Sequence, residues 1–406
     1  MRPNTMPGLT LQRCSLVGED HWHSALISLL RGIAAIEVAA AHLRALMYPG
    51  LRAIPDPSLW YQAFAFFTGF AHQAVLVFFV ISGWLVGGSL LNKLGQRQML
   101  VNYAIDRVTR LWTVLIPTFV LTLLFALYTN TVNPGTLDFS ATNEYSALVF
   151  VGNLFGLQRI TLPDFGGNFA LWSLANETWY YILFPLLVLL FTARSMAARG
   201  GSLVAVALLA AWIPTVIVLY FAVWLLGVAF SRVRIECGKG ARWALLLLLG
   251  AVSVYLRIKG NNDDYTADTI GQDLAFSLVF GIFLSAMQIK ADPNSAVFRS
   301  VSRYGKFFAD FSFSLYVMHL PLIFLLQHWS ANLGLKQLSP DRPLHFALYL
   351  AGLLFVLGAT YGAYLLFEAQ TYRVRRLLKA LVAGPGERRP AASKVPAERS
   401  QERLDS

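Results

Sequence analysis

The sequence has few charged residues and almost no cysteine. Only 14% of its 406 residues are charged and 56% are hydrophobic, whereas soluble domains usually contain about 25% charged residues. This balance excludes an ordinary soluble enzyme. The two cysteines, Cys14 and Cys237, are too few for a disulfide framework, and no cluster of His and Cys has the spacing of a metal site. We therefore expect no redox motif and no bound metal.

Other common features are also missing. The polar N-terminal segment 1–25 precedes an apolar run that has no small-residue cleavage pattern, which argues against a removable signal peptide. The net charge of +11 could suggest nucleic acid, but no basic patch lies beside a foldable soluble domain, so we expect no nucleic-acid partner. The mean hydropathy is +0.54 over the whole chain. What remains is a protein with many segments in the lipid bilayer.

The apolar segments predict the architecture. A helix needs about 20 apolar residues to cross a bilayer, and we interpret the sequence as an all-α polytopic membrane protein with ten transmembrane helices. A cytoplasmic segment 1–25 would precede a membrane-embedded domain 26–368 and a basic cytoplasmic tail 369–406, which we expect to be disordered. The predicted spans are 26–47, 74–91, 111–128, 177–192, 202–213, 214–230, 243–257, 274–289, 310–329 and 344–368.

The basic residues predict the orientation in the membrane. The apolar stretch 202–230, broken only at Pro214, could be a hairpin of two short helices or one long tilted helix. With the hairpin, one side holds 25 of the 33 Lys and Arg, and the other holds 7 when Arg44 and Arg257 at the span ends are included. The positive-inside rule then places both termini in the cytoplasm. One long helix would place every later loop on the opposite side of the membrane, so that basic segments would face the outside. We therefore predict the hairpin.

The first predicted span contains three ionisable residues. Arg31 and His42 are eleven residues apart, which returns a helix to within about 20° of the same face and separates them by about 16 Å. Arg31 would lie near the inner surface and His42 towards the outer half. A lone intramembrane histidine is often a packing residue bonded to a carbonyl, but the aligned Arg31 favours a functional role. Glu37 lies about 120° away, and we expect it to pair with another helix.

A second basic feature is the pair Arg107 and Arg110 immediately before the third span. Two residues three apart share a helix face. Such a pair is commonly only flanking charge of the positive-inside kind. It could also clamp phosphate groups, because guanidinium groups bind phosphate oxygens in bidentate fashion. Together with Arg31 the pair would form a cationic site on the cytoplasmic face, suited to a nucleotide-like cofactor.

Glu177 lies where a polar loop becomes the fourth apolar segment. It could simply satisfy free amides in the first turn of a helix. It could also orient a histidine, and our depth estimate places His42 in the same outer half. A histidine held by a carboxylate is the usual arrangement of a general base that acts on a hydroxyl.

Several other polar positions could line a cavity. The outer loop 129–176 is long enough to dip back into the bundle. Ser82-Gly83 is typical of close helix packing, and His319 could bond a carbonyl freed by Pro321. Outer aromatic residues could stack on sugar rings or belong to the aromatic belt at the membrane surface. The candidate substrate-binding residues are Ser82, Trp172, Ser173, Tyr316 and His319.

Five blocks follow one another in an order that resembles the acyltransferase-3 family of bacterial membrane O-acyltransferases, over about residues 25–368. Each block alone is mostly apolar and unspecific, but the order and spacing of all five are specific. The pair before Glu177 and the residue after it depart from the usual pattern of the family. The blocks are LLRGIAAIEVAAAH (29–42), FFVISGWL (78–85), DRVTRLW (106–112), LWSLANETWYYILFPL (171–186) and FSFSLYVMHLPL (311–322).

The resemblance implies a ten-helix protein of the bacterial inner (cytoplasmic) membrane. Such a protein moves an acyl group, usually acetyl, from cytoplasmic acyl-CoA to a hydroxyl of a surface polysaccharide, a lipid-linked glycan or a related acceptor. The functional positions of the family's motifs correspond to residues already identified above. Arg31, Arg107 and Arg110 would bind the CoA phosphates, His42 would be the catalytic base or acyl carrier, and Glu177 would position its imidazole. Direct transfer and an acyl-enzyme both remain open.

A different class of function would use the same intramembrane residues. In a proton-coupled transporter or flippase of a glycan or metabolite, His42 and Glu177 would relay protons. The sequence shows no inverted repeat by eye, and it has three arginines at the predicted inner face. These features, with the family resemblance, favour the acyltransferase.

Overall fold

The computed structural model describes residues 8–15, 18–96, 98–132, 138–262 and 265–382. It is almost entirely helical, which confirms the predicted all-α class. A short antiparallel pair of strands, β1 (Gly8–Leu11) and β2 (Val233–Glu236), was not predicted. In β2, apolar and charged residues alternate with the period of two that suits a strand.

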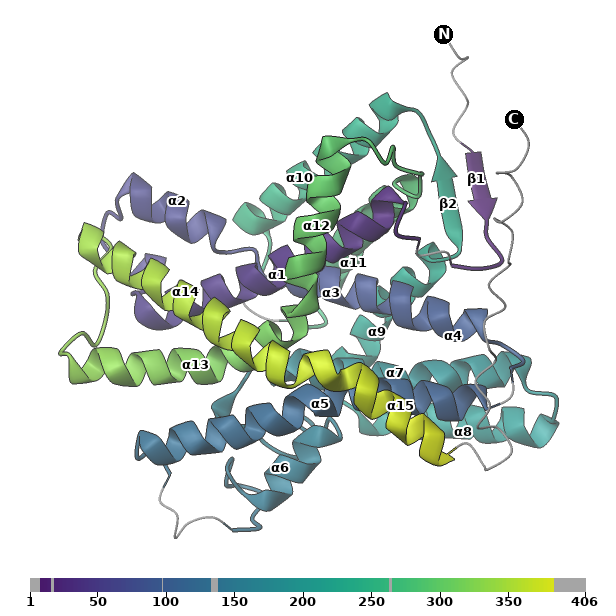
Figure 1. Cartoon of the computed structure of the whole chain (residues 1–406), viewed down its shortest axis with the longest axis horizontal. Coiled ribbons are helices and arrows are strands. Elements are labelled where there is room, and N and C mark those ends of the chain that lie inside the picture. Colours follow the sequence, from purple (N-terminus) through teal and green to yellow (C-terminus); the bar gives the residue numbers. More distant parts are fainter. Residues whose placement is uncertain (1–7, 16–17, 97, 133–137, 263–264, 383–406) are drawn as a thin grey trace, which may run out of the picture.

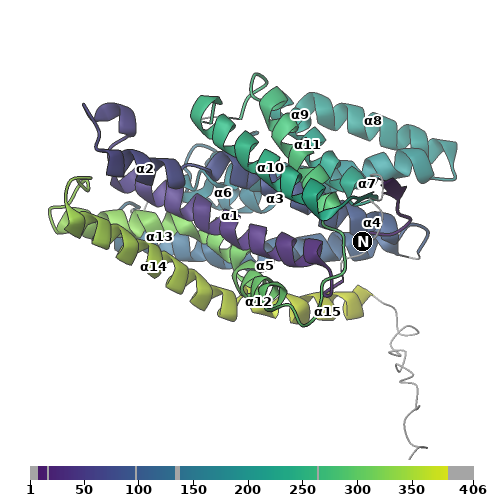
Figure 2. The same ribbon diagram turned by 90° about the horizontal axis from the view of Figure 1, so that it is seen from above.

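Long helices run roughly alongside one another through the molecule (Figures 1 and 2). Each of the ten predicted spans overlaps a helix of the structure. The main helices are α1 (Trp22–Met47), α3 (Ala71–Ser82), α5 (Met99–Tyr128), α7 (Leu171–Thr192), α8 (Met196–Trp212), α9 (Thr215–Phe230), α10 (Lys239–Lys259), α11 (Ile270–Ala286), α12 (Ala296–Asp310), α13 (Ser312–Asn332) and α14 (Pro343–Leu366). The shorter elements are α2 (Leu59–Phe67), α4 (Gly88–Asn92), α6 (Ala147–Leu154), α15 (Thr371–Val382), the π-helical turn η2 (Gly83–Gly87) and the 3-10 turns η1 (Leu51–Ala53), η4 (Phe165–Gly167) and η5 (Glu368–Gln370).

The helices have the length and composition of a polytopic membrane protein. Within the described residues, six helical segments are long and apolar enough to cross a membrane, or seven if the pair α12 and α13, bent by 49°, forms one span. Three more apolar helices, α8, α9 and α11, are shorter. The number of crossings and the cytoplasmic location of both termini therefore stay predictions. Strand β1 and the end of α15 do lie at the same end of the molecule (Figure 1).

The apolar stretch 202–230 forms two helices, as predicted. Helix α8 ends at Trp212 and α9 begins at Thr215. Pro214 stands at the break, because it has no backbone N–H to continue the hydrogen-bond pattern of the first helix.

Small residues let the helices approach closely, as is usual in membranes. A Cβ on Gly83 would overlap the Trp224 carbonyl oxygen, and a Cβ on Gly227 would overlap the Val80 carbonyl oxygen. The close helix packing predicted for Ser82-Gly83 therefore occurs at Gly83, where η2 packs against α9.

Glu37 pairs with a second helix, as predicted. Its carboxylate accepts a hydrogen bond of 2.8 Å from the backbone N–H of Phe70, the residue that precedes α3. A carboxylate there satisfies a free amide at the start of a helix and faces the positive end of its dipole.

The prediction of a disordered tail from residue 369 is wrong for its first part. Residues 371–382 form α15, which packs against α5 through ion pairs of Arg375 and Lys379 with the buried Asp106, at 3.4 and 2.6 Å. The tail contains leucines as well as basic residues, so it can fold as an amphipathic helix. The predicted disorder of residues 383–406 lies outside the described residues.

Candidate active site

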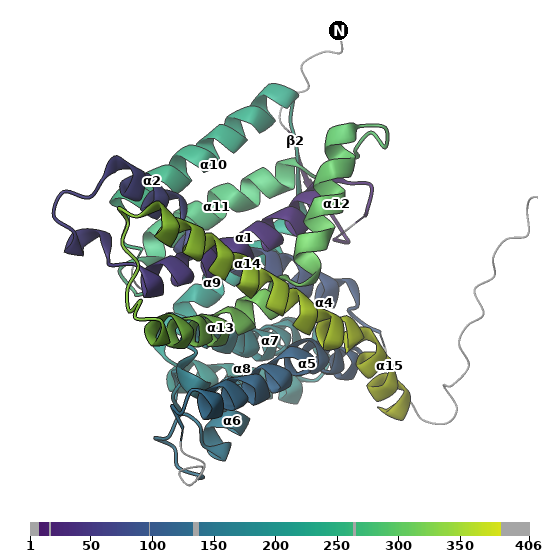
Figure 3. The same cartoon turned by 60° about the vertical axis from the view of Figure 1, so that its left-hand side comes forward.

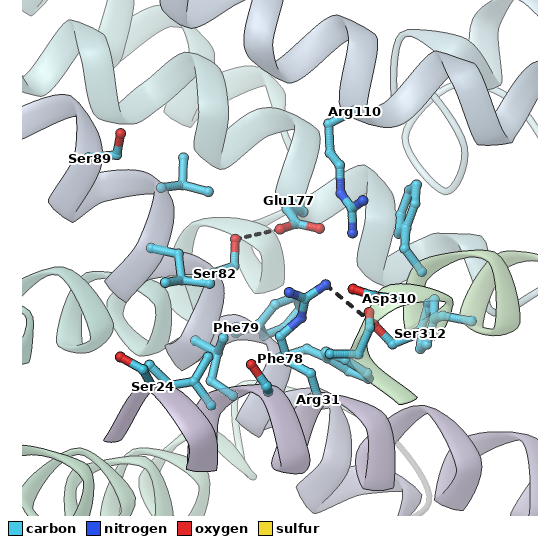
Figure 4. Close-up of a pocket in the computed structure, with 18 of the residues that line it drawn as sticks. Ser24, Arg31, Phe78, Phe79, Ser82, Ser89, Arg110, Glu177, Asp310 and Ser312 are labelled. Atoms are coloured by element: carbon cyan, nitrogen blue, oxygen red, sulfur yellow. Dashed lines mark hydrogen bonds between the residues drawn. The ribbon is translucent and has the colours of Figure 1, made fainter. Parts of the chain in front are cut away.

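A cavity of about 800 Å³ opens among helices α1, α3, α5, α7, α12 and α13. Arg31 of α1 and Arg107 and Arg110 of α5 all line it. Arg31 and Arg110 point into it from opposite sides (Figure 4). The structure thus brings together the three arginines that the sequence placed in one cationic site.

Two of these arginines are held by hydrogen bonds within the protein. Arg31 donates to the Ser312 hydroxyl at 3.3 Å. Arg110 donates to the Glu368 carboxylate at 2.5 Å, and its guanidinium lies 4.9 Å from the centre of the Phe313 ring. The bonds fix both cations at the cavity wall.

Arg107 is held differently. Its guanidinium lies over the rings of Tyr103 and Tyr181, at 5.8 and 5.5 Å from their centres. Its Nε is buried and has no hydrogen-bond partner among the described residues. A buried donor without a partner is costly. The Arg107 side chain as a whole is only partly buried, and it lines the cavity.

Glu368 is a site residue that the sequence analysis missed. One of its oxygens accepts from Arg110, and the other accepts from the backbone N–H and hydroxyl of Ser314, at 3.1 and 2.7 Å. The available signal was a carboxylate at the last position of the predicted span 344–368, where burial demands a partner.

Glu177 also lines this cavity, where its carboxylate accepts hydrogen bonds from the hydroxyls of Ser82 and Tyr181. Its bond to Ser82 is visible in Figure 4. The predicted pairing of Glu177 with His42 is therefore wrong. The reason is the start of α7, which begins at Leu171 rather than at residue 177, so Glu177 lies inside the helix and deeper than a first-turn residue.

The partner of His42 is another histidine. His42 Nδ1 lies 2.8 Å from His319 Nε2, and the two rings are stacked with their centres 5.1 Å apart. His319 Nδ1 lies 2.7 Å from the carbonyl oxygen of Tyr316. A carbonyl can only accept, so His319 carries its proton on Nδ1 and its Nε2 accepts from His42. His42 therefore donates through Nδ1, and its Nε2 keeps a lone pair that can take a proton.

The carbonyl group that Pro321 leaves without a donor in α13 accepts a hydrogen bond from the outer loop and not from His319. Pro321 has no N–H to bond the carbonyl of Val317, four residues earlier. Asn168 donates its side-chain amide to that carbonyl at 2.9 Å. The predicted role of His319 as the partner of the freed carbonyl is therefore wrong, and the expected return of the loop 129–176 into the bundle is confirmed at the buried Asn168.

Comparison with protein families gives the activity class. The family model described as an acyltransferase domain matches residues 25–367. The chain belongs to the acyltransferase-3 family. The match covers nearly the whole chain, so the resemblance found in the five sequence blocks is confirmed. Comparisons with curated proteins and with solved structures gave no match.

In this membrane acyltransferase, a polar and aromatic wall closes the arginine-lined cavity. Ser173 and Tyr316 both line the cavity and are joined by a hydrogen bond of 2.5 Å. The Tyr316 ring lies 5.4 Å from the ring of Phe78 and 6.0 Å from that of His319. Neither His42 nor His319 is among the described residues that line the cavity. The histidine pair therefore lies outside the cavity lining, with His319 next to Tyr316.

The predicted substrate-binding residues thus divide into two groups. Ser82, Ser173 and Tyr316 line the cavity. His319 lies with His42, and Trp172 packs against the rings of Phe79 and Tyr265, at 6.2 and 4.3 Å. The candidate site therefore comprises the arginine-lined cavity and a nearby histidine pair whose His319 ring lies 6.0 Å from that of Tyr316.

Proposed function

We propose that this acyltransferase takes its acyl group, acetyl by family expectation, from cytoplasmic acyl-CoA. It would transfer that group to a hydroxyl of a surface or exported glycan or a related acceptor in the bacterial inner membrane. The observation that carries the donor assignment is the meeting of Arg31, Arg107 and Arg110 in one cavity. Planar guanidinium groups match phosphate oxygens, and CoA carries several phosphates.

The charges of the other lining residues also support an anionic ligand. Arg375 and Lys306 also line the cavity, whereas its acidic lining residues Glu19, Glu177 and Asp310 are fewer than its basic ones. The cavity therefore favours a polyanion over a neutral sugar. In this proposal Glu177 organises the donor cavity through Ser82 and Tyr181 instead of acting on His42.

The histidine pair supplies the base. As the acceptor oxygen attacks the thioester carbonyl, His42 Nε2 takes the hydroxyl proton. The C–S bond then breaks, and His42 returns that proton to the departing CoA thiolate. The hydrogen bond from His42 Nδ1 to His319 keeps the lone pair on Nε2. The same lone pair would attack the thioester if an acyl-His42 intermediate forms. In this proposal the acyl end of the donor approaches this nitrogen beside Tyr316, which lines the cavity and lies next to His319.

Acyl-CoA consumption separates this proposal from a proton-coupled transporter. Purified protein in detergent is given acyl-CoA and a panel of glycan acceptors, and CoA release is measured, while vesicles test uptake of the same glycans. The acyltransferase releases CoA over many turnovers only with an acceptor, because an acyl-enzyme alone would release no more than one CoA per protein. Arg107→Gln with Arg110→Gln reduces that turnover. Arg194→Gln, at an exposed arginine, serves as the matched control. Glycan uptake without CoA release would overturn the proposal.

A further inference from the structure

A second cavity, of about 300 Å³, lies between the last turns of α5 and α13 and the predicted outer loop 129–176. We call it the loop cavity. Helices α5 and α13 run side by side (Figures 1 and 3), and both end on the side of the molecule opposite β1 (Figure 1). A cavity of this volume is at the lower end of the range of small-molecule sites.

Two glycines bring the backbone of the loop to this cavity. Gly166 and Gly167 both line it and have positive φ angles of 61° and 66°, a conformation that residues with a side chain rarely adopt. A Cβ on Gly166 would overlap the side chain of Thr122. A Cβ on Gly167 would lie 3.3 Å from Glu144 Oε2. The turn therefore places the Glu144 carboxylate next to the loop backbone at the cavity.

The threonine hydroxyls that line the loop cavity have already used their hydrogens. Thr122 donates to the carbonyl oxygen of Thr118 at 2.8 Å. Thr129 donates to the carbonyl oxygen of Phe125 at 2.9 Å, and its hydroxyl lies 2.7 Å from that of Thr131. Because the hydrogen of Thr129 is used, Thr131 donates to Thr129. The three hydroxyl groups therefore offer a ligand only lone pairs.

The charge of the loop cavity is opposite to that of the arginine-lined cavity. Glu144 is the acidic residue among the described residues that line it, and none of them is Lys or Arg. Burial and the nearby Asp164 raise the pKa of the Glu144 carboxyl. A carboxylate only accepts hydrogen bonds, as the threonine oxygens do here. This wall favours a ligand that brings hydroxyl hydrogens and disfavours a phosphate, which brings only acceptors.

The loop cavity and the histidine pair lie on different faces of α13. The residues of α13 that line the cavity begin at Pro321 and recur on one face of the helix. His319, two residues earlier, points about 160° away. The loop connects the two places, because the Phe169 N–H donates to the carbonyl oxygen of Gly167 at 2.8 Å and the Phe169 ring lies 5.1 Å from that of His42. A ligand that occupies the cavity and also reaches His42 must therefore be longer than one sugar ring.

We propose that the loop cavity binds one uncharged sugar ring of the acceptor through hydroxyl groups that donate to Glu144 and Thr129, while a neighbouring ring of the same glycan meets His42. The rings of Tyr145 and Phe324 also line the cavity and offer apolar surface to the C–H groups of a sugar. Binding of a part of the substrate remote from the reacting hydroxyl helps to hold that hydroxyl in place. The inference rests on the proposed function where it names the ligand as the acceptor.

Protection of a thiol at the rim tests this site without any acyl transfer. In the full-length protein with Cys14→Ser and Cys237→Ser, Thr131→Cys places a thiol at an exposed lining position. Its rate of reaction with a charged thiosulfonate is measured in detergent with methyl glycosides of glucose, galactose, mannose and N-acetylglucosamine, and with glucosamine and phosphorylated glucose. Thr142→Cys, at an exposed threonine of the same loop outside the cavity lining, is the matched control.

We expect at least one methyl glycoside to slow the reaction at 131 several-fold and to leave 142 unchanged. The same rate with and without every glycoside would overturn the proposal. Slowing by glucosamine alone would replace hydroxyl recognition with an ion pair to Glu144, and equal slowing by phosphorylated glucose would contradict the acceptor-rich wall. No acyl-CoA is present, so failure here leaves the donor assignment untouched.

A charge-neutral substitution tests the role of Glu144. Hydrogen bonds to charged groups are stronger than those to neutral groups, so in Glu144→Gln the glycoside concentration that gives half-protection should rise roughly five- to ten-fold. Asp341→Asn removes an exposed carboxylate outside the cavity lining and should leave that concentration unchanged. A melting temperature measured beside it checks that the variant folds. Unchanged half-protection in folded Glu144→Gln would overturn the assignment of Glu144 as a sugar ligand.

Discussion

Substitution of His319, the hydrogen-bond partner of His42, tests whether the histidine pair contributes to catalysis. In His319→Ala the His42 Nδ1–H loses the acceptor that lies 2.8 Å away, and nothing then holds the lone pair on Nε2. An unpartnered buried donor costs about 1–3 kcal/mol, which corresponds to roughly 5- to 150-fold in rate if the loss falls on the transition state. We expect a fall of about 10- to 100-fold in kcat, by this range. Loss of His42 itself should cost about 100- to 10,000-fold.

A second substitution separates positioning from proton transfer. In His319→Gln an amide oxygen can still accept from His42 Nδ1–H, although the side chain cannot take a proton at neutral pH. If His319 only positions His42, this variant should recover most of the activity that His319→Ala loses. CoA release in detergent at saturating acyl-CoA gives kcat, and acyl-CoA binding should not change in either variant.

Stability must be checked beside activity, because His319 is fully buried and a truncation there leaves a void. His345→Ala is the matched control. His345 is also buried and accepts a hydrogen bond of 2.7 Å from the backbone N–H of Ser339, outside the arginine-lined cavity. An active His319→Ala would refute the positioning role, and a His319→Gln variant as inactive as His319→Ala would show that His319 itself carries the proton.

Three further predictions concern the cavity wall, the packing and the topology. Glu368→Gln should lower thermal stability by about 1–3 kcal/mol, because one amide cannot accept from both of its partner groups; unchanged melting would contradict the inferred bonds to Arg110 and Ser314. Gly227→Ala should cost about 1–3 kcal/mol through overpacking against the α3 backbone, visible as a lower melting temperature, and a neutral result would contradict the close approach. Reporter fusions after Gly240 and after Asp264 should report inside and outside, respectively; the reverse pattern would contradict the predicted orientation.

The sequence predicted what depends on composition and local spacing. Long apolar runs identify membrane helices because the lipid core permits few alternatives. A break at Pro214 follows from the missing N–H. The gathering of Arg31, Arg107 and Arg110 followed from helix geometry and from their common predicted side. The predicted gathering of these three arginines in one site is the part of the site prediction that agrees best with the structure.

Partners between distant segments could not be derived in this way. Glu177 was paired with His42 because both were assigned to the outer half, but depth alone does not fix which helices are neighbours. The bond between His42 and His319 joins residues 277 positions apart, and that between Arg110 and Glu368 spans 258. Such contacts depend on how the helices pack, which the periodicity of one helix does not encode.

The most direct test of the account is the equilibrium affinity for acyl-CoA of the purified protein, measured by calorimetry in detergent. We expect binding to the unaltered protein and nearly the same affinity in His42→Gln, because His42 is not among the described residues that line the cavity. In Arg107→Gln/Arg110→Gln each lost phosphate contact, worth about 1.5–3 kcal/mol, should weaken binding by roughly ten-fold or more, and added salt should weaken it further in the unaltered protein. Absence of acyl-CoA binding by the unaltered protein, or an unchanged affinity in the double arginine variant, would contradict the claim that the arginine-lined cavity is the donor site.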